Sequence, residues 1–253
     1  MDDITDSGNR RWGRKVWWRL PEVGLNAVND ASILEHMGYQ ILKQEFQDNP
    51  NFVELMDLLQ RGIMMSSVGR NYDEHVANPQ HFDEISPKTY SDVVFLKNTY
   101  IAFYLPTMSG LLANGRGKDP RTHRAVTDMA HDLGLMLQFQ DDFEDCYNED
   151  EEDPRLDVRT GRCSWPIVAA KERANDKQMK ILRDNYGKRE KKNVDAVMSV
   201  FNDLRIAEVF QTEQEVNFQR IQEKIDQNAD ILPPAIFNYA FDTMRYYRRI
   251  LRE

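Results

Sequence analysis

The stretch Leu137-Gln138-Phe139-Gln140-Asp141-Asp142-Phe143-Glu144-Asp145 organises this chain, because an apolar helical pattern ends there in an acidic cluster. Every fourth residue leading into it follows one side of a helix and drifts slowly around that side. These residues are Met129, Leu133, Leu137, Asp141 and Asp145. The pattern predicts a helix from Pro120 to about Cys146 whose carboxylates point the same way as its core. A carboxylate in that position is costly unless it meets a cation.

A second acidic cluster opens the chain with the same D-D-x-x-D spacing. It consists of Asp2, Asp3 and Asp6, and its counterpart consists of Asp141, Asp142 and Asp145. We expect the two clusters to lie on separate helices and to face each other across a cavity. Hard carboxylate oxygens suit Mg²⁺, which keeps positions for water and substrate phosphate. The alternatives are a solvated helix end for the later cluster and a disordered acidic N-terminus for the earlier one.

Length, charge and cysteine content exclude several classes of protein. The chain has 253 residues and a formal net charge of −9, with no basic stripe, which argues against a nucleic-acid partner. Its two cysteines make no disulfide framework and indicate a reducing, cytoplasmic compartment. No apolar run reaches the roughly 18 residues that span a bilayer, so we expect no membrane span, and no signal-peptide pattern opens the chain.

The pattern along the chain is helical almost throughout, and no segment alternates between apolar and polar residues as a strand would. Besides the central helix, helices are expected at about 29–46, 52–68, 89–113 with a kink at Pro106, 164–174, in two or three pieces up to about 226, and from Pro233 onward. Segments 10–22 and 148–162 are expected to be loops. The prediction is one all-α domain over residues 1–253, with its site between facing helices.

Further motifs accompany the acidic clusters. Leu156-Asp157 precedes Arg162-Cys163-Ser164-Trp165, and the first cluster is followed by Arg11, Gly13 and Trp17-Trp18. Together the motifs resemble those of the farnesyl diphosphate synthase family of trans-isoprenyl diphosphate synthases, whose patterns are F-Q-x-Q-D-D-x-x-D and T-D-x-x-x-x-K-C-S-W. The resemblance covers essentially the whole chain. It implies an isoprenoid-synthase-type helical bundle with a central cavity, truncated by the loss of the helices before the first motif.

The resemblance implies a metal-dependent reaction on an allylic isoprenoid diphosphate. Asp2, Asp6 and Asp141 would ligate Mg²⁺, and Asp3, Asp142 and Asp145 would support that cluster through water or hydrogen bonds. Breaking the allylic C–O bond makes a carbocation and inorganic diphosphate, and metal ions stabilise the charge that develops on the leaving group. An apolar, aromatic-lined cavity would shield the cation from water.

The resemblance also implies residues that bind substrate and take part in the reaction. The substrate-binding residues would be Arg11, Asp73, Lys97, Arg155 and Arg162, of which Arg155 is the cation left in a shortened loop. The catalytic residues would be Lys97, Gln138 and Asp141, with Gln138 beside the reacting carbon. The family's usual state implies a homodimer.

Several positions depart from the family pattern. Trp12 stands where the family has a second arginine, Asn98 where it has threonine and Arg70 where it has glutamine. A neutral indole cannot replace a bidentate phosphate donor, which favours a terpene synthase, a diphosphate lyase, acting on geranyl or farnesyl diphosphate. The first alternative is a farnesyl or geranyl diphosphate synthase, a prenyltransferase that adds isopentenyl diphosphate. The second is a truncated, non-catalytic helical subunit.

Overall fold

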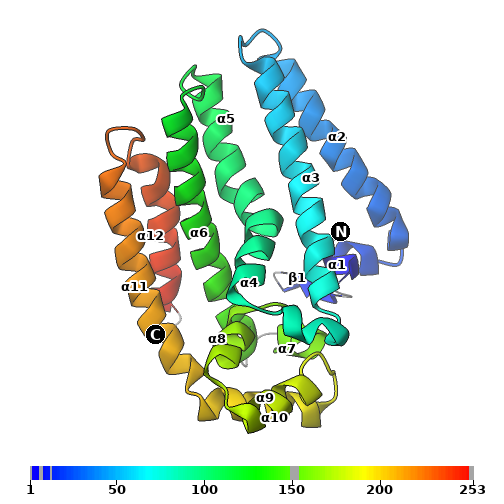
Figure 1. Ribbon diagram of the computed structural model, residues 1–253. Coiled ribbons are helices and arrows are strands. Elements are labelled where there is room, and N and C mark those ends of the chain that lie inside the picture. The colour runs from blue at the N-terminus through cyan, green and yellow to red at the C-terminus, as the bar shows by residue number, and fades with distance from the viewer. Residues whose placement is uncertain (1, 6–7, 12, 149–153, 251–253) are drawn as a thin grey trace. The chain divides into compact units, whose positions relative to one another are not determined.

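The computed structural model describes residues 2–5, 8–11, 13–148 and 154–250 (Figure 1). These residues are helical almost throughout, so the predicted all-α class is confirmed. The chain divides into two compact units, Met1–Leu59 and Gln60–Glu253, and each is considered by itself. A single domain over 1–253 stays a prediction. Within the described residues, every helix is too short or too polar to cross a membrane.

The first unit holds short elements followed by one long helix. They are α1 (Asp2–Thr5), β1 (Arg10–Arg11), β2 (Arg14–Lys15), the 3-10 turns η1 (Trp17–Arg19) and η2 (Gly24–Asn26), and α2 (Ala27–Phe46). The helix predicted at 29–46 is confirmed as α2. The loop predicted at 10–22 is wrong in part, because β1 and β2 pair as a small antiparallel hairpin. Gly13 makes that turn possible with a φ of 73°, which glycine adopts without steric cost.

Helix α3 (Phe52–Val76) leads into the second unit. The further elements are η3 (Pro79–Glu84), α4 (Pro87–Val94), the π-helical segment η4 (Phe95–Tyr104), α5 (Leu105–Ala113), α6 (Pro120–Tyr147), α7 (Leu156–Thr160), α8 (Trp165–Arg173), α9 (Asp176–Asn185), α10 (Lys191–Asp203), α11 (Ile206–Gln227) and α12 (Ala235–Ile250). Two boundaries differ from prediction. The helix expected to end near Val68 continues to Val76, which places Asp73 on a helix, and the predicted charged loop contains α7.

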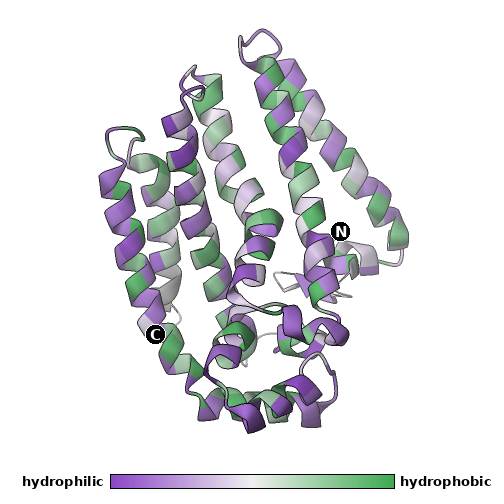
Figure 2. Ribbon diagram, in the orientation of Figure 1, coloured by the Kyte–Doolittle hydropathy of each residue, from purple (hydrophilic) through white to green (hydrophobic). Residues whose placement is uncertain are grey.

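Helix α6 is the centre of the second unit (Figure 1). It starts where the sequence signals a start, since the Asp119 carboxylate accepts the backbone N–H of Arg121 at 3.0 Å and Pro120 occupies the first turn. It packs against η4, α8, α11 and α12. Figure 2 shows hydrophilic and hydrophobic residues alternating along α11, as expected for a helix with one buried face.

The register of α6 corrects the predicted stripe. Met129 and Leu133 are fully buried, but Leu137 is 43% exposed and Asp141 is exposed. Each four-residue step advances a side chain about 40° beyond one full turn, so the three steps from Met129 to Asp141 accumulate about 120°. The buried carboxylate is instead Asp142, which is only 3% exposed. It lies about 140° around the helix from Met129, on a side that α8 covers, where the backbone N–H of Trp165 donates to it.

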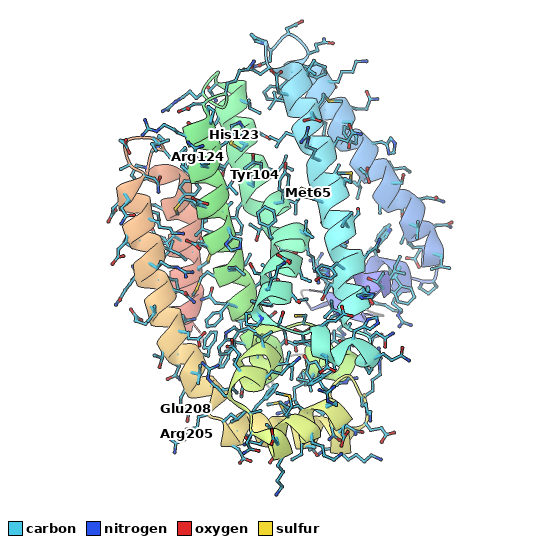
Figure 3. The ribbon with its side chains drawn as sticks, in the orientation of Figure 1. Met65, Tyr104, His123, Arg124, Arg205 and Glu208 are labelled. Atoms are coloured by element: carbon cyan, nitrogen blue, oxygen red, sulfur yellow. The ribbon has the colours of Figure 1, made fainter. Side chains whose placement is uncertain are left out.

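Segment η4 packs unusually close to α3 and α6, because a glycine faces it on each. A Cβ at Gly69 would lie 2.4 Å from the backbone nitrogen of Lys97, and a Cβ at Gly134 would lie 1.9 Å from Thr99 Oγ1. The Ser66 hydroxyl donates to the Lys97 carbonyl at 3.1 Å. Near the start of α6, Tyr104 Oη and His123 Nδ1 lie 3.1 Å apart and join η4 to α6 (Figure 3).

The π-helical hydrogen bonding also explains how the chain accommodates Pro106. A proline lacks an N–H and its ring clashes with the carbonyl four residues earlier in an α-helix. The wider turn ends at Tyr104, and α5 restarts with Pro106 in its first turn. The predicted kink at Pro106 thus takes the form of a π segment directly before it, a form that often occurs at functional sites.

An ion-pair group joins α6 to α11. Asp132, which is buried, contacts Lys224 Nζ and lies 3.5 Å from Arg220 Nη2. Burial by itself would raise the pKa of Asp132, but His131, Lys224 and Arg220 outweigh it and lower the pKa below its ordinary 3.8. The ionised carboxylate therefore stabilises the contact between the two helices.

We predict that Gly134→Ala destabilises the protein by about 1–3 kcal/mol, because the added methyl group would lie 1.9 Å from Oγ1 and 2.7 Å from Cβ of Thr99, a short side chain that is fully buried. Gly110→Ala is the matched control, since its Cβ would meet nothing within 4 Å. In helix α5 that control should gain about 0.5–1 kcal/mol. Urea unfolding measures both changes. Equal stability of the two variants would contradict the close approach of η4 to α6.

We predict that Asp132→Asn lowers the free energy of unfolding by about 1–2 kcal/mol at pH 7. Because the folded pKa is lowered, the stabilisation is present above the unfolded pKa and is lost as pH falls through the folded pKa. The difference between wild type and variant should therefore be full at pH 6–7 and shrink below about pH 4. A difference independent of pH in urea titrations would rule out the ionic role.

Candidate active site

A small polar cavity lies in the second unit where α3, η4, α6 and the segment after α7 meet. Its volume is about 40 Å³, which is room for a few water molecules or an ion rather than for an isoprenoid chain. It is lined by Asp73, Val93, Val94, Lys97, Asn98, Gln138, Asp142, Asp157, Arg162, Cys163 and Ser164. Five of the residues predicted from the sequence to act together are brought together here: Asp73, Lys97, Gln138, Asp142 and Arg162.

Two cations converge on one carboxylate in this cavity. Lys97 Nζ lies 2.8 Å and Arg162 Nη1 lies 3.3 Å from Asp73 Oδ2, and Arg162 Nη2 donates to Glu74 Oε1 at 2.6 Å. Burial opposes the charge on Lys97, but Asp73 outweighs it and raises the pKa of the lysine. Both cations are therefore held charged and in fixed positions. Such an arrangement suits the binding of an anionic ligand.

An amide–carboxylate chain forms the opposite wall. Asn98 Nδ2 donates to Gln138 Oε1 at 2.5 Å, and Gln138 Nε2 donates to Asp142 Oδ1 at 2.6 Å and to Asp141 Oδ2 at 3.2 Å. The backbone N–H of Trp165 completes the chain by donating to Asp142 Oδ2 at 2.7 Å. Every amide and carboxylate orientation in the chain is fixed by its neighbour.

The carboxylates around the cavity repel one another. Burial, with Asp141 nearby, raises the pKa of Asp142 to about 7. Burial also raises the pKa of Asp157, with the neighbouring carboxylates Asp145, Asp142 and Asp73 adding to the effect. A divalent cation would relieve this repulsion, and carboxylate oxygens are the ligands that Mg²⁺ prefers. The donor set therefore fits the predicted metal.

Two predicted residues take structural positions beside the cavity. Both oxygens of Asp145 accept backbone N–H groups at the start of α7, from Leu156 at 3.2 Å and from Asp157 at 3.1 Å. Arg155 precedes α7 with a φ of 62°, and its backbone N–H donates to the carbonyl of Asp145 at 2.7 Å. Asp145 thereby anchors the chain that brings Asp157 and Arg162 to the cavity, and Arg155 is not among the lining residues.

The first acidic motif lies in the other unit. Asp3 and Arg11 form a forked pair there, with Arg11 Nη2 2.7 Å and Nε 3.0 Å from Asp3 Oδ1. Asp3 and Ile4 also line a hollow of about 490 Å³, together with Trp17, Trp18, Ala27, Asp30, Ala31, Ile33 and Leu34. Asp6 and the side chain of Asp2 fall outside the described residues. The roles predicted for this motif stay predictions.

The structure adds two residues to the predicted set. Asp157 lines the cavity, and Asn98 orients Gln138, although the sequence singled out neither as a site residue. Asp157 could have been found from its place in the Leu156-Asp157 pair, and Asn98 from its place beside Lys97. Cys163 and Cys146 are buried thiols, which fits a packing role. The ring of Phe210 stacks on those of Phe139 and Phe143, and Trp165 meets Phe139 edge to face.

Comparison with known proteins gives consistent results. A family profile described as polyprenyl synthetase matches residues 1–204. The chain is 30% identical over 240 residues to the farnesyl pyrophosphate synthase of Bos taurus, covering 93% of this chain and 68% of that protein. It is 32% identical over 225 residues to the farnesyl pyrophosphate synthase of Panax ginseng, covering 87% of this chain and 65% of that protein. The chain thus spans about two thirds of the length of these relatives.

A solved structure shows the same fold. The T. brucei farnesyl pyrophosphate synthase superposes with a TM-score of 0.81 at 21% identity, over 88% of this chain and 69% of that one. The relatives named here are synthases, so they favour the chain-elongation alternative over the predicted terpene synthase. The leaning towards a diphosphate lyase is not supported by these comparisons.

We predict that Asp73→Asn destabilises the protein by about 1–3 kcal/mol, because it leaves two largely buried cations, Lys97 and Arg162, without their shared counter-charge. The matched control is Asp83→Asn, whose partner Arg183 forms an exposed pair at 2.7 Å, and it should change stability little. Thermal unfolding of both variants at pH 7 provides the measurement. A larger loss for the control would refute the assignment.

Proposed function

The chain belongs to the polyprenyl synthetase family, in the farnesyl diphosphate synthase group, and on this basis we propose that it is a Mg²⁺-dependent prenyltransferase. The proposed substrates are an allylic isoprenoid diphosphate and isopentenyl diphosphate. The observation that carries the proposal is the polar cavity, where two fixed cations face an amide–carboxylate chain. Two fixed cations beside carboxylates suit a substrate that is anionic and binds metal, and they would not help to bind a neutral substrate.

The proposed reaction joins two isoprenoid units. The allylic C–O bond breaks, and diphosphate leaves with the electron pair. The double bond of isopentenyl diphosphate then attacks the carbocation to form a C–C bond, and a proton is lost from the neighbouring carbon. The barrier lies mostly in charge separation, so preorganised cations near the leaving group contribute most of the acceleration.

Lys97 and Arg162 are the residues that bind diphosphate in this proposal. They already converge on one anionic oxygen, Asp73 Oδ2, and a diphosphate oxygen offers the same charge to the same donors. Asp73 keeps both side chains extended towards the cavity before substrate arrives. This preorganisation reduces the entropy lost on binding.

Asp141 is the residue of the second motif that we assign to the metal. It is exposed at the end of the amide–carboxylate chain, whereas Asp142 is buried and accepts two hydrogen bonds. Asp142 and Asp145 would support the metal site without binding the ion directly. In the first motif, Asp2 and Asp6 are the predicted ligands and Asp3 has the same supporting role. When bound, Mg²⁺ would neutralise the charge developing on the diphosphate.

Gln138 presents a fixed amide dipole in the proposed site. Its oxygen is occupied by Asn98 and its nitrogen by the two adjacent aspartates, so the amide cannot flip. Asn98 therefore keeps a hydrogen-bond donor at the position where the family has threonine. This departure from the family pattern gives no reason by itself to prefer a lyase.

Product analysis separates the three functions that the sequence left open. Incubation with geranyl diphosphate and isopentenyl diphosphate should yield a longer diphosphate, and omitting isopentenyl diphosphate should stop its formation. A hydrocarbon or alcohol made from the allylic diphosphate alone would establish the lyase instead. No turnover in any mixture would point to the non-catalytic subunit. A homodimer and a cytoplasmic location are further predictions, which light scattering and cell fractionation can test.

We predict that Asp141→Ala lowers kcat at least about a hundredfold, because the proposed metal loses a ligand at the leaving group. The same substitution at Asp128, which is exposed on the same helix, should leave kcat unchanged. Both variants should melt near the wild-type temperature, since neither side chain is buried. Steady-state kinetics over a range of Mg²⁺ concentrations measures kcat for both variants. Undiminished turnover of the Asp141 variant would show that this carboxylate has no part in the mechanism.

A further inference from the structure

Two histidines and a glutamate gather on the surface of the second unit, outside the proposed active site. His75 stands in the last turn of α3, and His81 and Glu84 stand on η3. One potential ligand atom from each of the three lies within 4.8 Å of the others. Among the described residues, this is the group of three that satisfies that condition. None of the three is a residue assigned above to the prenyltransferase reaction.

Local structure explains why the three side chains meet. His81 and Glu84 lie three residues apart on η3, which is kinked at His81, where φ is −102° and ψ is 15°. The turn between α3 and η3 brings His75 beside them. Hydrogen bonds hold the backbone of this turn, since the side chain of Asn78 caps η3 by accepting the N–H of Gln80 at 3.0 Å. Lys171 Nζ also donates to the carbonyls of Phe82 and Ile85, at 2.6 Å each.

The distances suit a tetrahedral metal ion. His75 Nε2 and Glu84 Oε2 lie 3.3 Å apart. Two ligand atoms bound 2.0–2.1 Å from Zn²⁺ in tetrahedral geometry are separated by about 3.3 Å. The imidazole rings of His75 and His81 lie side by side, with centroids 4.0 Å apart and an angle of 35° between their planes. The three side chains are partly exposed and can adjust to an ion without moving the backbone.

A hydrogen bond to the backbone also orients the His81 ring. Its Nδ1 lies 2.8 Å from the backbone carbonyl of His75, and because a carbonyl can only accept, Nδ1 must carry the proton. The lone pair of the neutral ring is then on Nε2. Histidine ligands of metals commonly donate their second ring N–H to a backbone carbonyl, which fixes both tautomer and orientation.

We propose that His75, His81 and Glu84 form a binding site for one divalent transition-metal ion of the Zn²⁺ class, with water as the fourth ligand. Two imidazoles and one carboxylate favour Zn²⁺ over Mg²⁺, which prefers oxygen ligands alone. The ion would join α3 to η3 directly beside Asp73 and Glu74, the residues that hold Lys97 and Arg162. Its binding would therefore brace the end of the helix that lines the cavity.

Titration calorimetry of the whole chain with Zn²⁺, in excess Mg²⁺ to occupy carboxylate sites, tests the site. Wild type should bind one Zn²⁺ per chain and melt at a higher temperature when it is bound. The double variant H75A/H81A should bind Zn²⁺ at least about tenfold more weakly than wild type. Glu84→Gln should also weaken Zn²⁺ binding, by the same factor or by less. His36→Ala, which removes an exposed histidine from the other unit, should bind as wild type does.

Co²⁺ gives a second measurement on the same variants, because four-coordinate Co²⁺ absorbs visible light far more strongly than the six-coordinate ion. The strong bands should be present in wild type and His36→Ala and absent in H75A/H81A. If H75A/H81A does not fold by circular dichroism, Glu84→Gln decides the result alone. Zn²⁺ affinity unchanged by Glu84→Gln and H75A/H81A, or no Zn²⁺ bound by wild type, would overturn the proposal, and neither outcome depends on prenyltransferase activity.

Discussion

The close approach of η4 to a glycine on each side is the constraint from which the second unit's site follows: Gly69 meets the backbone of Lys97, and Gly134 meets the side chain of Thr99. A methyl group at either position would overlap atoms of η4, so the three elements can approach this closely only with glycine. The approach puts Lys97 and Asn98 between the side chains of α3 and those of α6. The π-helical hydrogen bonding of η4 supports this placement, because it widens the turn before Pro106 and lets α5 resume as a regular helix.

Close packing makes the electrostatics of the cavity strong. Charges that are largely removed from water interact more strongly with one another, and leaving any of them unpaired is costly. Asp73 supplies the counter-charge for Lys97 and Arg162. The Trp165 N–H and Gln138 donate the hydrogen bonds that the buried Asp142 needs. The same side chains that stabilise the fold are thereby the ones set in position for an anionic, metal-bound substrate. The proposed Zn²⁺ site stands at the end of the same helix, so α3 connects the two.

Local chemistry made much of the helix pattern predictable. The helices predicted at 164–174 and from Pro120 are confirmed as α8 and α6, and each has a proline in its first turn, which is a short-range signal for a helix start. The end of α3 was missed because polar residues in its last two turns resemble a loop when taken alone. The hairpin of β1 and β2 was missed because strands of two residues are too short to show alternation.

The sequence by itself determined the helical class, the family and the side chains capable of the chemistry, since these depend on residue types and on spacings within one element. Tertiary structure alone decided which carboxylate is buried. Four-residue spacing rotates steadily around a helix and carries Asp141 away from the buried face. Asp142 is buried because α8 packs over its side of α6 and Trp165 donates to it. Tertiary structure also decided which neighbours Asp157 and Asn98 have in the cavity, for instance Gln138 for Asn98, because these neighbours are distant in the chain and no local pattern records a contact that only packing creates.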